Sequence, residues 1–78
     1  MPLVYEQILE AKRKRMKLLL KILESHIGDK ADKALAWFRI QTGLREEKSN
    51  EYLRDLVKAG IVTIEDGIIK EVKPIEIL

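Results

Sequence analysis

The residues with the clearest chemical character form a dense basic run near the start of the chain. Lys12, Arg13, Lys14, Arg15 and Lys17 fall within six consecutive positions. Cations at this density can bind phosphate oxygens, because neutralising phosphates releases their counterions. Two other interpretations remain open. The run could be a solvated helix face without a ligand, or a segment lying on a membrane surface, although the apolar residues beside it are few for membrane insertion.

A second polar cluster lies near the middle of the chain, on a segment expected to be helical. Its exposed members are expected to be Arg45, Glu46, Glu47, Lys48, Asn50, Glu51 and Arg54. Arginine and lysine can bind phosphate or guanine, and asparagine can pair with adenine. The three glutamates repel a phosphate backbone, and a mixed solvated face is their simpler interpretation.

The chain offers little for catalysis or metal binding. It has no cysteine and a single histidine, His26, which excludes disulfides, thiolate sites and histidine-rich metal sites. No Ser/His/Asp arrangement, phosphate-cradling glycine loop or metal-ligand spacing is present. The sequence therefore predicts no catalytic residues, no metal and no cofactor, and it indicates a protein that is not an enzyme.

Length and charge restrict the function further. We expect residues 1–78 to form one domain, and so short a chain buries a small core that helix packing or self-association must support. The formal net charge is +2, but residues 1–44 carry nine basic and five acidic side chains, and residues 45–78 carry six and eight. With no membrane-spanning stretch and no signal-peptide pattern, we expect a cytoplasmic protein that does not bind membranes.

A long first helix is predicted over residues 4–27, since the segment from 4 to 26 contains no glycine or proline. Its second half has a wide apolar stripe typical of a domain helix. Its first half, up to residue 14, extends beyond that stripe. This extension could be the start of a long helix, or it could pair with its copy in a homodimer, which we favour. The residues expected at that interface are Tyr5, Ile8, Leu9 and Met16.

Two further helices are predicted within residues 29–58, separated by a turn at Gly43. Asp29 has the character of an N-cap for the second helix, which runs to about Gln41. One face of that helix is apolar, and we expect Trp37 and Ile40 to widen it, with Trp37 in the core. The third helix is predicted from Glu46 to Lys58.

The period then changes from helical to strand-like over residues 61–73. Two β-branched runs, 61–65 and 68–72, flank Asp66-Gly67, a pair typical of a type I′ hairpin turn. The tail, residues 74–78, is apolar after Pro74, and it could add an edge strand or reach a partner.

The stretch QTGLREEKSNEYLRDLVKAGIVTIEDGIIKEV resembles winged helix-turn-helix domains, and it looks most like the small archaeal ones. The residues that carry the resemblance are Thr42, Gly43, Leu44, Tyr52, Leu53, Leu56, Gly60, Ile61 and the Asp66-Gly67 turn. The resemblance implies a mainly α fold with a small β-hairpin: three helices and a two-stranded wing, here with an extended N-terminal helix.

The resemblance also implies double-stranded DNA as the partner, with the third helix in the major groove. The positions that would contact DNA are Arg45, Lys48, Asn50 and Arg54 on this helix, together with the basic run of the first helix. We therefore expect a small dimeric transcription regulator. The alternative is a protein-interaction module on the same fold without DNA binding. Two departures from the family pattern favour the alternative: the acidic residues of the third helix and the acidic wing tip, Glu65-Asp66.

Overall fold

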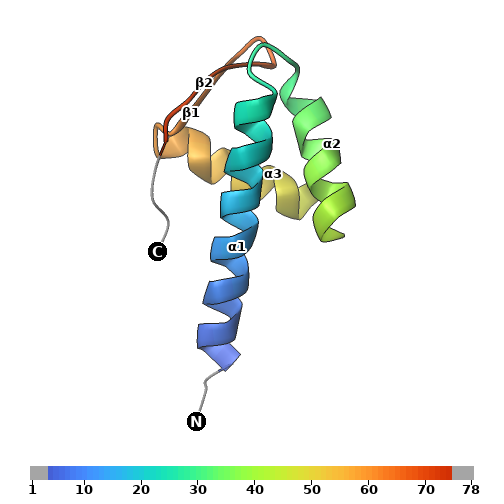
Figure 1. The fold of residues 1–78 in the computed structure, drawn as a ribbon, viewed down its shortest axis with the longest axis vertical. Helices are drawn as coiled ribbons and strands as arrows, with labels where there is room; N and C mark the ends of the chain where they lie inside the picture. The colour runs from blue at the N-terminus through green and yellow to red at the C-terminus, as the bar shows by residue number, and fades with distance from the viewer. Residues whose placement is uncertain (1–3, 75–78) are drawn as a thin grey trace.

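The computed structural model describes the backbone of residues 4–74 and the side chains of residues 9–74. It contains three helices, α1 (Val4–Ser25), α2 (Ala31–Thr42) and α3 (Glu46–Lys58). They are followed by an antiparallel hairpin of β1 (Val62–Glu65) and β2 (Ile68–Val72) (Figure 1). The expectation of a mainly α fold with a small hairpin is thus confirmed.

The core lies where α1, α2 and the hairpin meet. Leu19 and Leu23 of α1 and Phe38 of α2 are fully buried, and Ile69 of β2 closes the core from the hairpin side. The ring of Phe38 meets that of Tyr52 on α3 edge to face, with 5.8 Å between the centroids. This geometry is favourable because the positive edge of one ring faces the negative face of the other. Below this core, the N-terminal half of α1 projects beyond the rest of the described chain (Figure 1).

Positive backbone φ angles at two turns confirm what the sequence predicts for them. Gly43 ends α2 with φ of 72°, and its N–H donates to the carbonyl of Arg39 at 2.8 Å. Asp66 and Gly67 have φ of 53° and 75°, as a type I′ turn requires at its two central positions. These local conformations fix where the chain reverses direction.

A β-bulge interrupts the hairpin register between Thr63 and Ile64. On one side Thr63 pairs with Glu71, and on the other Ile64 pairs with Ile69, which leaves Lys70 as an extra residue on β2. Because of this insertion, Ile69 and Val72 both face the core although they lie three positions apart. Strict alternation in the sequence would have placed them on opposite faces.

The backbone between α1 and α2 pairs with β2, which the sequence did not reveal. Gly28 N donates to Ile69 O at 2.8 Å, Ile69 N donates to Asp29 O at 3.0 Å, and Lys30 forms an isolated bridge with Ile68. The prediction that Asp29 is the N-cap of the second helix is wrong. Lys30 holds that position without a side-chain cap bond, because Asp29 is engaged in the pairing with β2.

The predicted burial of Trp37 and Ile40 is also wrong. Trp37 is 48% exposed and Ile40 is 72% exposed. The α2 helix packs through Ala34, Leu35 and Phe38, and no described element covers its opposite side. The face that these two residues share therefore remains open to solvent.

Candidate nucleic-acid interface

Four exposed cations form a basic ridge along α1: Arg13, Lys14, Lys17 and Lys21. Arg13, Lys17 and Lys21 are four residues apart, so they follow one side of the helix at intervals of about 6 Å. Glu10 contacts Lys14 at 3.9 Å, but both side chains are more than two-thirds exposed, and such a pair contributes little to stability. Between residues 11 and 23 the helix carries six basic side chains and no acidic one.

The structure divides the five predicted basic residues between different sides of α1. Arg13, Lys14 and Lys17 belong to the basic ridge. Lys12 lies outside the ridge, beside a hollow that it lines together with Arg13 and with Leu9 and Met16, two of the predicted dimer residues; Arg15 is half-buried. The other predicted dimer residues, Tyr5 and Ile8, have side chains outside the described part.

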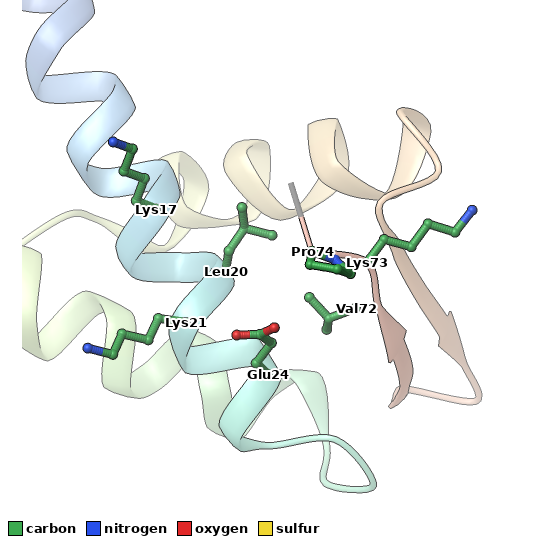
Figure 2. Close-up of a pocket in the computed structure, with 7 residues that line it drawn as sticks. All are labelled: Lys17, Leu20, Lys21, Glu24, Val72, Lys73 and Pro74. Carbon is green, nitrogen blue, oxygen red and sulfur yellow. The ribbon is translucent and has the colours of Figure 1, made fainter. Parts of the chain in front are cut away.

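A pocket of about 250 Å³ separates the basic ridge from the end of β2. Leu20, Val72 and Pro74 supply its apolar surface, and Lys73 adds a cation on the far side (Figure 2). The amino groups of Lys17 and Lys21 point away from the β2 side of the pocket in Figure 2, so the cations stand at its edges. Glu24, which also lines the pocket, lies beyond the C-terminal end of the basic ridge.

The α3 helix presents a polar face of mixed charge. Its buried residues are Ser49, Tyr52 and Leu56, which leaves Arg45, Lys48 and Arg54 exposed, as predicted. Asn50 is half-buried. Residues 45–58 carry four basic and four acidic side chains, so the local charge is zero.

One exposed ion pair reduces the free positive charge of α3 further. The amino group of Lys48 lies 3.4 Å from a carboxylate oxygen of Glu51, and both side chains are about half exposed. This face therefore attracts phosphate only weakly. Arg45 and Arg54 are the cations of the predicted set for which no such pair is found among the described residues.

Ser49 illustrates how the helix tolerates a polar core residue. It is fully buried. Its hydroxyl donates to the carbonyl of Glu46 at 2.9 Å. Because a buried hydroxyl with a partner costs far less than one without, α3 stays docked in the core.

Two cations of this surface were not predicted from the sequence. Lys21 continues the four-residue spacing of Arg13 and Lys17, so the helical period contained the signal. Lys73 comes from a distant part of the chain, and only the folded hairpin brings it to the pocket beside Lys17 and Lys21. No local sequence pattern could have indicated that Lys73 lines the same pocket as Lys17 and Lys21.

Comparison with known proteins identifies no relative. The chain matches no protein-family model, no curated protein and no solved structure. Among the described residues, no cluster of three or more histidine, cysteine or acidic side chains could hold a metal ion. Within the same residues, no helix is long and apolar enough to cross a lipid bilayer.

Proposed function

We propose that this chain is a winged helix-turn-helix protein that binds double-stranded DNA, acting in the cytoplasm as a small dimeric transcription regulator. The observation that carries the proposal is the basic ridge of α1, which concentrates exposed cations on a chain of low net charge. Phosphate contacts of this kind supply most of the affinity for non-specific DNA.

The arrangement of the elements supports the winged-helix part of the proposal. Three helices precede a hairpin, and residues 28–30 pair with β2 to add a third strand-like segment. The exposed polar side of α3 is then the surface expected to meet base edges. In this arrangement Arg45, Lys48, Asn50 and Arg54 read the groove, and the basic ridge binds the backbone.

The acidic residues of α3 offer a test in which binding should improve. Replacing Glu46, Glu47 and Glu51 by glutamine removes three negative charges and releases Lys48 from its ion pair. If α3 faces DNA, affinity for duplex DNA at low salt should rise at least several-fold, because phosphate repulsion is removed. Replacing Asp29, Asp32 and Glu71 by neutral amides changes the net charge equally at exposed positions outside α3 and the wing tip, and serves as the control for α3.

Fluorescence anisotropy of a labelled duplex measures this affinity. A larger gain in the α3 variant than in the control variant supports the assignment of α3 as the reading helix. Equal gains would mean that net charge alone acts. Absence of binding by the wild-type protein at about 50 mM salt would overturn DNA binding, because electrostatic binding is strongest there.

The homodimer is part of the same proposal. The N-terminal half of α1 projects from the body, and Leu9 and Met16 line a hollow on it that the described residues leave open. A helix segment without packing partners is only marginally stable in water. Pairing with a second copy through Leu9 and the neighbouring Tyr5 and Ile8 would supply such packing.

A protein-interaction module is the second candidate function, and the exposed Trp37 and Ile40 favour it. Trp37 borders a groove of about 330 Å³ between α1 and α2, where Leu18 and Ile22 supply apolar surface. Tryptophan is enriched at protein interfaces. If the function lies here, Trp37→Ala abolishes partner binding, whereas Arg13, Lys14 and Lys17, which do not line the groove, can be neutralised without effect.

A further inference from the structure

The groove between α1 and α2 joins an exposed aromatic ring to one end of the basic ridge. Trp37 of α2 and Lys21 of α1 both line this groove, and Lys21 is also the last cation of the ridge. We propose that the groove binds an unpaired base of single-stranded nucleic acid, with the base stacked on Trp37 and the adjoining phosphates on the ridge. This inference goes beyond duplex binding, and it rests on the proposed function only in using the same ridge for phosphate.

Trp37 offers the flat apolar face on which a base can stack. Its side chain is 48% exposed, and Leu18 and Ile22 supply further apolar surface on the α1 side of the groove. Bases of every kind stack on aromatic side chains, because each base has a π-face. The volume of the groove, about 330 Å³, lies at the lower end of the range of about 300–1,000 Å³ found for small-molecule sites. The groove therefore suits a single base.

Two polar side chains of the groove can meet the edge of a stacked base. The Nδ1 atom of His26 lies 2.8 Å from the carbonyl oxygen of Ile22, which only accepts hydrogen bonds. In the neutral ring Nδ1 therefore carries the proton, and Nε2 is left to accept a hydrogen bond from a ligand. Gln41 also lines the groove, and its amide offers a donor and an acceptor. Base edges carry both kinds of group.

The charge of the groove favours an anionic ligand. None of the residues that line it is acidic, and Lys21 is the full cation among them. The only acid of α2 is Asp32, five positions before Trp37, which places it about 140° away around the helix. Glu24 of α1 lines the pocket next to β2 instead. A phosphate beside the groove thus meets a cation and no carboxylate of the groove lining.

The ridge extends away from the groove along α1, which favours a polyanion as the occupant. Lys17 and Arg13 lie about 6 Å and 12 Å from Lys21 along the helix axis. A single strand has a phosphate at every nucleotide, so it can place one base in the groove and its next phosphates on the ridge. An isolated carboxylate of a protein partner would use Lys21 alone. In a duplex the bases are paired and stacked on one another, and exposing one of them costs free energy.

The fluorescence of Trp37 tests the proposal without a label, because it is the only tryptophan of the chain. A short oligothymidylate should quench this emission saturably at about 50 mM salt, where phosphate binding is strong. Thymidine monophosphate should bind about tenfold more weakly or worse, since it cannot reach along the ridge. A relaxed circular duplex, which has no ends and no unpaired bases, should quench little at the same phosphate concentration.

Three outcomes of this titration would overturn the proposal. Absence of quenching by the oligothymidylate would exclude a base on Trp37. Equal affinity for the mononucleotide and the oligonucleotide would exclude the ridge from the site. Equal quenching by the circular duplex would show that the groove does not select unpaired bases.

Substitutions at Trp37 separate stacking from general hydrophobic contact. Trp37→Leu keeps an apolar side chain but removes the aromatic face, and it should weaken binding of a labelled oligothymidylate by about fivefold or more. Trp37→Phe keeps a ring and should stay within about twofold of the wild type. Ile40→Ala removes an exposed apolar side chain of the same helix that does not line the groove, and should have no effect. Equal losses for Trp37→Leu and Trp37→Phe would refute stacking.

The salt dependence tests the contribution of the ridge to single-strand binding. Arg13→Gln/Lys17→Gln changes two cations that do not line the groove. Loss of two phosphate contacts should reduce the slope of log affinity against log salt by about 1.4 for a single strand. An unchanged slope would overturn the phosphate part of the proposal. Duplex binding without quenching of Trp37 by the oligothymidylate would refute this inference alone, whereas quenching without duplex binding would refute only the proposed function.

Discussion

Neutralising two cations of the basic ridge should reduce the salt dependence of DNA binding by a calculable amount. Lys17 and Lys21 are exposed, and no ion pair is found for either of them among the described residues. In the control variant, Lys30 and Lys33 are replaced instead; they are exposed at the N-terminal end of α2, outside the basic ridge and outside α3. Replacing either pair with glutamine lowers the formal net charge of the chain from +2 to 0.

The magnitude follows from counterion release. Each lost phosphate contact reduces the slope of log affinity against log salt by about 0.9, so loss of two contacts reduces it by about 1.8. Between about 50 and 200 mM salt this corresponds to roughly a 12-fold change in the ratio of wild-type to variant affinity. Anisotropy titrations of a labelled duplex at four or five salt concentrations measure both slopes. If Lys30→Gln/Lys33→Gln flattens the slope as much as Lys17→Gln/Lys21→Gln does, the basic ridge is not the phosphate-binding surface.

Three further predictions concern the fold and the assembly. Phe38→Ala should lower the free energy of unfolding, measured by urea titration, by about 3–5 kcal/mol. Trp37→Ala should lower it by less than about 2 kcal/mol, because the indole is half exposed. Equal losses of stability would contradict the burial of Phe38 and the exposure of Trp37. Gly43→Ala should cost about 1–2 kcal/mol by the same assay, since φ is positive and the added methyl meets no neighbour; a neutral effect would argue against the left-handed turn. Ile8→Glu should convert the proposed dimer to a monomer in sedimentation equilibrium, and an unchanged mass would count against an interface on the projecting half of α1.

The hairpin shows which structural features the local sequence predicts and which it does not. Asp66-Gly67 between two β-branched runs was sufficient to place the turn, because the requirement for positive φ acts on the turn residues themselves. The bulge opposite Thr63 and Ile64 was not foreseen, since it depends on which side chains of β2 the helices cover. The inward orientation of both Ile69 and Val72 is a consequence of that packing.

In the candidate site, too, some features can be predicted from the local sequence and others depend on the tertiary structure. The spacing of Arg13, Lys17 and Lys21 places them on one side of a helix whatever surrounds it. The pocket beside Leu20 exists because the hairpin runs back along α1. The same path brings Lys73 to this pocket. A sequence pattern therefore identifies the basic ridge, but it does not say what lies next to it.

By itself, the sequence determined the order of the elements, the glycine turns and the basic character of the first helix. These features depend on residues within about one helical turn of each other, so the backbone preferences of a short segment decide them. Only the tertiary structure decided that Trp37 and Ile40 lie on the surface, that Asp29 pairs with β2 instead of capping α2, and that Lys73 lines the same pocket as Lys17 and Lys21. The physical reason is that burial and strand pairing are properties of distant segments, since a side chain is covered only if another element packs against it.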